Sequence, residues 1–176
     1  MKKRINKKGF EMSFGVIFSI IIIAVTIFVA VYVIGIFLDR VEQMKFIDNI
    51  KKIDVEVDSA AETTQSSKVI GLDAPKGTTY LCFANLSRQG ISSVMFTDIN
   101  NFYGNTDNNV FFYPLRTAEK YGTKSAWKIL CGDNNNGRDC IFTQTNPLCI
   151  RNIDGKFTFR IENPGDYSGK INVKTA

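Results

Sequence analysis

The longest pattern in the chain is an uninterrupted apolar run from Phe14 to Leu38. The run has 25 residues and contains no charged side chain. As an α-helix it would reach about 37 Å, more than the ~30 Å hydrocarbon thickness of a bilayer. The apolar core of a secretory signal peptide has roughly 7–15 residues, and no A-x-A cleavage pattern follows this run. The run therefore predicts a membrane-spanning helix over 14–38.

The next stretch keeps a helical period against a charged background. Its apolar positions recur at steps of four and three residues, which places them on one stripe of a helix. The run KIDVEVD competes with this interpretation, because Ile53, Val55 and Val57 alternate as in a strand. We expect a helical stalk over 39–67, whose stripe packs on the following domain or, alternatively, forms a coiled-coil seam. The stripe consists of Phe46, Ile50, Ile53, Val57, Ala60 and Thr64.

From residue 68 onward, short β-prone runs alternate with turn residues. In KFTFRIE the apolar and polar residues alternate, as in an antiparallel strand with one buried face. The preceding Asp154-Gly155 predicts a two-residue hairpin, because both positions tolerate positive φ. We expect the last three runs to form a three-stranded meander. The expected strands cover 68–72, 78–84, 92–96, 109–115, 125–131, 139–143, 147–153, 156–162 and 169–174.

These patterns predict an α+β fold, in which a long N-terminal transmembrane helix continues as a stalk and carries an antiparallel β-sheet head. Charge sets the expected orientation, because a flank rich in Lys and Arg stays in the cytoplasm. The C-terminal domain is then extracytoplasmic. The expected parts are a basic N-terminus (1–13), a transmembrane helix (14–38), a stalk (39–67) and a β-rich domain (68–176).

The net charge of +5 comes entirely from the N-terminal tip. Beyond the tip, the remaining 17 Lys and Arg equal the 17 Asp and Glu in number. No basic face for nucleic acid is expected, and nucleic acid is excluded as a partner. The tip carries Lys2, Lys3, Arg4, Lys7 and Lys8.

Four cysteines lie beyond the apolar run, at positions 82, 131, 140 and 149. An even number of cysteines in an extracytoplasmic domain predicts two disulfides, with three connectivities open. We favour Cys131–Cys140, which closes the loop GDNNNGRD, and Cys82–Cys149, which joins distant strands. A zinc site is disfavoured because the sequence has no CxxC pair and no histidine.

The sequence carries no recognisable catalytic motif. The absence of histidine removes Ser-His-Asp and Cys-His nucleophilic arrangements and the commonest general base. No GxSxG, HExxH, P-loop or GxGxxG pattern is present. We therefore expect neither an enzyme nor a cofactor.

Two polar stretches offer weaker candidates for binding and modification. In DNNNGRD, Asp133, Asn135 and Asp139 present oxygen ligands for calcium, but Gly137 falls one place early for an EF-hand and the final Glu is missing. A disulfide-closed turn is the favoured interpretation. The triplet NLS makes Asn85 a candidate for N-glycosylation.

The opening KKGFE, followed by an apolar helix, resembles the class III signal sequences of type IV pilins and archaeal pilin-like proteins. In that family a prepilin peptidase cuts after the glycine, and the retained helix serves as anchor and then as filament core. The resemblance covers residues 1–38 and implies a processing site at Gly9, Phe10 and Glu11. A carboxylate near a helix start is favoured by the helix dipole. Glu11 would be the second mature residue, whereas bacterial type IV pilins usually place glutamate at the fifth.

A second resemblance covers more of the chain. YLCFANL and LCIRNIDGKFTFRI resemble segments of small archaeal single-pass membrane proteins with a β-rich head, which implies a fold and no activity. We expect a pilin-like or pseudopilin-like structural protein whose partners are the bilayer, other copies bound through the helix, and a prepilin peptidase. Gly15 and Ser19 would permit close helix contact. The alternative is an unprocessed single-pass anchor that carries a binding domain or a subunit of an envelope complex.

Overall fold

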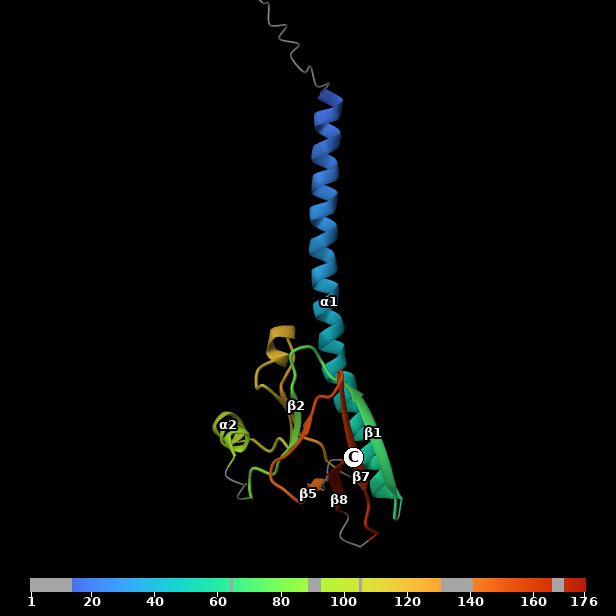
Figure 1. Cartoon of the computed structure of the whole chain (residues 1–176), viewed down its shortest axis with the longest axis vertical. Coiled ribbons are helices and arrows are strands. Elements are labelled where there is room, and N and C mark those ends of the chain that lie inside the picture. Colours follow the sequence, from blue (N-terminus) through green and yellow to red (C-terminus); the bar gives the residue numbers. More distant parts are fainter. Residues whose placement is uncertain (1–13, 64, 89–92, 105, 131–140, 166–169) are drawn as a thin grey trace, which may run out of the picture. The chain divides into compact units, whose positions relative to one another are not determined.

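The computed structural model describes residues 14–63, 65–88, 93–104, 106–130, 141–165 and 170–176. The fold is α+β, with one long apolar N-terminal helix followed by sheets rich in antiparallel pairs (Figure 1). The chain divides into two compact units, of which the first ends at Asp39 and the second covers Arg40–Ala176.

The helices are α1 (Phe14–Glu62) and α2 (Val94–Tyr103), with a short 3₁₀ helix η1 (Ala118–Tyr121). The strands are β1 (Ser67–Asp73), β2 (Tyr80–Phe83), β3 (Val110–Tyr113), β4 (Ala126–Trp127), β5 (Ile141–Thr143), β6 (Leu148–Arg151), β7 (Lys156–Glu162) and β8 (Ile171–Thr175).

The part of α1 that belongs to the second unit buries one face in the core of that unit. KIDVEVD lies within this helix, so its helical interpretation is correct and its strand interpretation is wrong. Asn49 is also buried on this face, and its side-chain amide donates a 2.7 Å hydrogen bond to the carbonyl of Asp73 in β1. The helix ends at Glu62, five residues before the expected end of the stalk. Its buried residues are Phe46, Asn49, Ile53, Val57 and Ala60.

The first sheet has the strand order β1-β7-β8-β5. β1 and β7 are antiparallel over their full lengths, from Ser67 opposite Glu162 to Asp73 opposite Lys156. The alternation expected in β7 is confirmed, because Phe157, Phe159 and Ile161 are buried and the residues between them are exposed. β5 lies parallel to β8, so the sheet is not purely antiparallel.

The second sheet has the order β4-β3-β2-β6, and all its pairs are antiparallel. One face joins the main core, where the rings of Phe46 and Phe112 lie 5.0 Å apart between centroids. Phe83 and Phe159 bring the two sheets together at 5.2 Å. The opposite face carries Phe111 and packs against α2. Alternate side chains of β3 therefore serve two separate clusters.

The run expected to form a strand over 92–96 instead begins α2, which corrects that prediction. Ser93 caps the helix, because its hydroxyl accepts the backbone N–H of Phe96 at 3.1 Å. Met95 and Ile99, four residues apart, then face the cluster on the second sheet. Five apolar and small residues do not distinguish a strand from one helical turn.

The expected three-stranded meander at the C-terminus is correct for β7 and β8, which pair antiparallel, and wrong for β6. β6 pairs with β2 in the second sheet, whereas β7 and β8 belong to the first. The predicted turn itself is present, with positive φ at Asp154 (51°) and Gly155 (78°) and a bridge between Ile153 and Lys156. Only Ile153 and Lys156 pair across the hairpin, because β6 then continues into the second sheet and β7 into the first.

Candidate functional site

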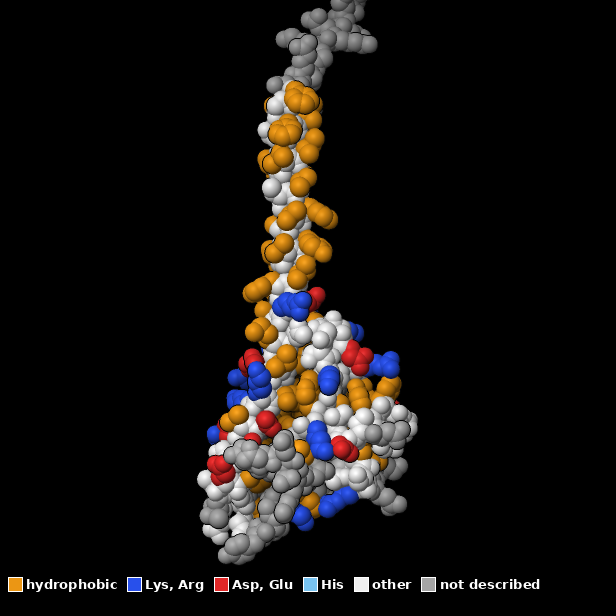
Figure 2. All heavy atoms as spheres, turned by 180° about the vertical axis from the view of Figure 1, so that it is seen from behind, with side chains coloured by type: hydrophobic (Ala, Val, Ile, Leu, Met, Phe, Trp, Pro, Cys, Tyr) orange, Lys and Arg blue, Asp and Glu red, His pale blue; other side chains and the backbone are white. Residues whose placement is uncertain are grey.

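The apolar segment, Phe14–Leu38, exposes its side chains along its whole length. Its large apolar residues are between 43% and 83% exposed, and none of the most apolar window is buried. Figure 2 shows hydrophobic side chains along this segment with no charged ones among them. By length and composition, α1 is able to span a membrane. A helix that is apolar on all sides requires lipid or other apolar helices around it.

The hydroxyl groups inside this segment bond to the helix itself. Ser19 Oγ donates to the carbonyl of Gly15 and Thr26 Oγ1 to the carbonyl of Ile23, both at 2.8 Å. Such internal bonds satisfy polar groups where water is absent. At Gly35 a Cβ atom would meet nothing within 4 Å, so the packing of this chain does not require glycine there.

Several of the predicted site residues lie outside the described part of the chain. The whole processing motif, one cysteine pair and the candidate calcium ligands are in this group, so these hypotheses stay predictions. They are Gly9, Phe10, Glu11, Cys131, Cys140, Asp133, Asn135 and Asp139.

A disulfide joins Cys82 and Cys149. The two residues lie directly opposite each other in β2 and β6. Cys82 is fully buried in the cluster beneath α2, beside Phe111 and Ile99. The bond connects positions 67 residues apart and fixes β6 to the second sheet.

Asn85, the glycosylation candidate, follows β2 and is half-buried. Its side-chain oxygen accepts the N–H of Ser87 at 3.0 Å, which closes an Asx turn. Its backbone N–H donates to Asn146 Oδ1 at 2.9 Å, and its carbonyl accepts Asn146 Nδ2 at 2.7 Å. These bonds give the turn a structural role, and glycosylation stays a prediction.

Asn85 also borders a small cavity of about 60 Å³ that the sequence did not indicate. Arg88 and Lys170 lie 5.0 and 5.8 Å from the ring centroid of Phe142 in its wall. Phe142 is only partly buried. The cavity has room for a few water molecules, and both cations already interact with the ring. We assign it no ligand.

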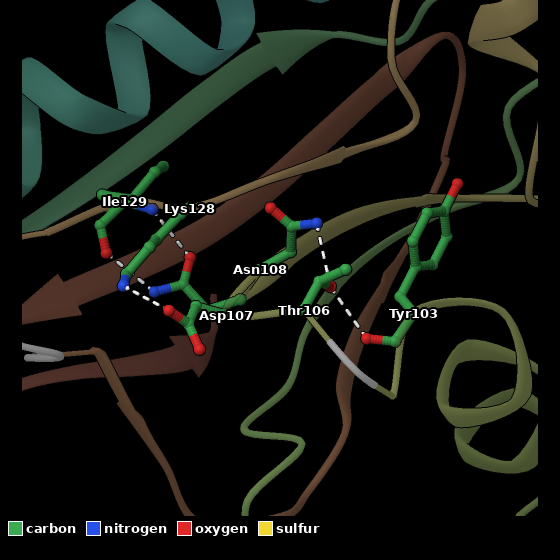
Figure 3. Close-up of polar contacts among 7 residues, drawn as sticks. Tyr103, Thr106, Asp107, Asn108, Lys128 and Ile129 are labelled. Carbon is green, nitrogen blue, oxygen red and sulfur yellow. Dashed lines mark hydrogen bonds and ion pairs between the residues drawn. The ribbon is translucent and has the colours of Figure 1, made fainter.

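The turn after α2 is tied to the strand region around β4 by polar contacts (Figure 3). Lys128 Nζ lies 3.1 Å from Asp107 Oδ2, and Asn108 Nδ2 donates to Thr106 Oγ1 at 3.0 Å. Asn109 exchanges two hydrogen bonds with the backbone of Ile129, at 2.7 and 2.9 Å. These polar side chains therefore support the fold. In the described ranges, no group of three or more His, Cys, Asp or Glu residues is placed to hold a metal ion.

The carboxylate of Glu42 ties α1 to the loop after β1. It accepts Lys45 Nζ and the backbone N–H of Lys76, both at 2.8 Å. Burial opposes ionisation of Glu42, but these hydrogen bonds and the neighbouring charges hold its pKa below the usual value. At Asp54, burial and the nearby Asp58 raise the pKa. The contacts of Glu42 therefore hold the loop after β1 against α1.

Comparison of the chain with family models, curated proteins and solved structures gives no match. A functional assignment must therefore come from the exposed apolar segment and from the surface of the second unit.

Proposed function

We propose that this chain is a membrane-anchored, extracytoplasmic structural protein of the pilin-like or pseudopilin-like kind, which assembles through its N-terminal apolar helix. The observation that carries the proposal is the uncharged, exposed surface of Phe14–Leu38. Burying apolar surface is worth about 25 cal/mol per Å², so water is a poor environment for this segment. Lipid and neighbouring copies of the same helix both supply the apolar surroundings that it needs.

The expected orientation is supported by two further observations. The cationic tip precedes the apolar segment, and Lys- and Arg-rich flanks stay in the cytoplasm. The disulfide Cys82–Cys149 lies on the other side of the segment in the chain, and disulfides persist in oxidising compartments. Both observations favour export of the second unit.

Self-association is supported by the outer face of α1 within the second unit. Met44, Ile47 and Val55 are exposed there, opposite the buried side that contains Phe46 and Ile53. Their spacing of three and eight residues places them on one side of the helix. In the apolar segment, Gly15 and Ser19 supply the small side chains that close helix packing in membranes uses.

The N-terminus of the mature protein tests the pilin-like part of the proposal. Protein extracted from native membranes is analysed by intact mass and N-terminal sequencing. We expect a chain that begins at Phe10, and we expect Gly9→Val to retain the basic tip. A wild-type chain that retains residues 1–9 would instead favour the unprocessed anchor with a binding domain.

Assembly is tested by cross-linking in native membranes. Ser19→Leu keeps the segment apolar but fills the small pair, and we expect several-fold fewer cross-linked oligomers. Thr26→Leu is the matched control, because it removes the same type of hydroxyl outside the pair, and it should behave as wild type. Equal yields in the two variants would argue against assembly through this face. Solubility of the wild-type protein without detergent would contradict the membrane anchor itself.

A further inference from the structure

The turn between β6 and β7 joins two strands that separate at once. Ile153 N–H donates to the carbonyl of Lys156 at 2.9 Å, and Lys156 N–H donates to the carbonyl of Ile153 at 3.0 Å. Beyond this bridge β6 follows β2, and β7 lies between β1 and β8. In Figure 1 the orange chain of β6 and the red β7 leave this shared turn in diverging directions.

The divergence leaves a groove of about 320 Å³ between the two strands. This volume is at the lower end of the range of ligand pockets. The β6 side is formed by Cys149 and Arg151, the turn contributes Ile153, and the β7 side is formed by Lys156 and Thr158. Thr175, at the end of β8, and Ala176 also border the groove.

The main chain of β6 presents hydrogen-bonding groups to this groove. Asn152 N–H donates to Thr79 beside β2 at 2.8 Å, so alternate residues from Asn152 direct their N–H and C=O groups toward β2. The N–H and C=O groups of Cys149 and Arg151 therefore point away from β2, toward the groove. Those of Ile153 point the same way and bond to Lys156 at the start of β7. Because β6 is the edge of its sheet, no strand in the described part of the chain pairs with that side. An unpaired edge is a template for another strand.

The charge of the groove favours one type of strand. Arg151 and Lys156 are exposed, and neither has an ion-pair partner among the described residues. No Asp or Glu side chain of the described residues lines the groove, and the α-carboxylate of Ala176 at its border forms no ion pair with Arg151 or Lys156. Ile153 is 66% exposed and adds an apolar contact. Arg151 and Ile153 are two residues apart and so lie on one face of the chain at the end of β6. A strand that presents both carboxylates and an apolar side chain on that face would match this arrangement.

We propose that this groove binds an extended, acidic peptide segment of a partner protein by strand addition to β6. The peptide backbone pairs with Cys149 and Arg151, which gives affinity without a fixed sequence. Its carboxylates face Arg151 and Lys156, and an apolar side chain covers Ile153. The inference is independent of the proposed membrane assembly, because every residue involved belongs to the second unit.

The test uses the full chain in detergent micelles, with any affinity tag kept away from Ala176. The probe is a fluorescent, capped octapeptide of glutamate, valine and threonine that carries glutamates and one valine on the same face of the strand. Binding is followed by anisotropy. We expect Arg151→Glu combined with Lys156→Glu to weaken binding at least tenfold. Lys120→Glu combined with Lys124→Glu is the matched control, since these exposed lysines lie outside the groove and the change in charge is equal. The control should bind as wild type does.

A second probe separates strand addition from simple charge attraction. The same peptide carrying N-methyl groups at alternate residues keeps its carboxylates but cannot complete a strand ladder, and we expect its binding to be lost. The unmethylated peptide should slow hydrogen exchange at the amides of Cys149 and Arg151.

Three results would overturn the proposal. They are equal binding of the N-methylated peptide, equal weakening in the lysine control, and no binding by the wild-type chain. If the wild-type chain instead forms dimers that the Arg151 and Lys156 reversal dissolves, and binds no peptide, the occupant is a second copy rather than an acidic partner.

Discussion

Phe46 is the residue through which α1 enters the aromatic core of the second unit. Its side chain is fully buried and lies near the rings of Phe112, Tyr121 and Trp127. Phe46→Ala leaves a cavity that these rings cannot fill, so we expect a loss of about 3–5 kcal/mol in the free energy of unfolding. Urea unfolding followed by circular dichroism in detergent measures it.

The control for this variant is Met44→Ala, two residues away on the exposed side of the same helix. Its effect should stay within about 0.5 kcal/mol. Similar losses in the two variants would mean that α1 does not pack through its Phe46 face.

Glu42 gives a prediction about pH. Because its pKa is lowered in the folded chain, its stabilisation is present above the unfolded value of 4.5 and is lost as pH falls through the folded pKa. Glu42→Gln should therefore reduce stability at pH 7 and flatten the fall in stability below about pH 5. Urea midpoints at pH 7, 5, 4 and 3 measure this.

Glu62→Gln, which removes one carboxylate from the exposed end of α1, is the control that is matched in charge. A slope that is unchanged in Glu42→Gln would show that the contact with Lys45 and Lys76 contributes nothing in solution.

At the scale of elements, Asn163 connects the end of α1 to the turn after β7. Its side-chain amide donates to the carbonyls of Ala60 and Thr63 at 2.8 and 2.9 Å, and its oxygen accepts Gly165 N–H at 2.9 Å. The last carbonyls of a helix have no partner within it. Asn163→Ala should therefore cost about 1–3 kcal/mol and speed hydrogen exchange over 60–66.

Asn163→Asp separates the two roles of this side chain. It keeps an acceptor for Gly165 but presents a carboxylate to the two helix carbonyls. We expect it to be at least as destabilising as Asn163→Ala, and wild-type stability in this variant would contradict the role given to the amide donor.

Sequence patterns correctly predicted the elements in which buried residues recur at one regular spacing. The stripe of α1 repeats over several turns, and β7 alternates strictly between Phe157, Phe159 and Ile161, so each pattern identified its element. The start of α2 was missed because its main signal is the cap at Ser93, a single hydroxyl within a short apolar run. The partner of β6 was missed because the Asp154-Gly155 turn fixes a local hairpin and carries no information about the next pair.

At the scale of the whole molecule, the disulfide Cys82–Cys149 restricts the unfolded chain between positions 67 residues apart. Replacing both cysteines by alanine should lower the free energy of unfolding by about 2–4 kcal/mol. Thermal or urea unfolding under non-reducing conditions measures this loss. A double variant as stable as the wild type would show that the β2–β6 pair holds without the bond.

The candidate sites differ in how far the sequence reveals them. The apolar segment Phe14–Leu38 is evident from composition, because a membrane span is a property of consecutive residues. The groove beside β6 was not predictable, because it exists only where Arg151 and Lys156 meet across two strands that enter different sheets. A single sequence does not show that β6 and β7 enter different sheets.

The strand order of the first sheet has a consequence for the synthesis of the protein. β1 emerges early from the ribosome, yet its neighbour β7 begins at Lys156 and β8 ends at Thr175. Until those last residues arrive, β1 has no paired strand, and the second sheet covers only part of the apolar side of α1. Non-local pairing of this kind is slow. A nascent chain is therefore exposed to proteolysis and aggregation until β7 and β8 have been synthesised. Premature termination before β8 would leave a polypeptide that quality control should remove rather than a shortened but usable one.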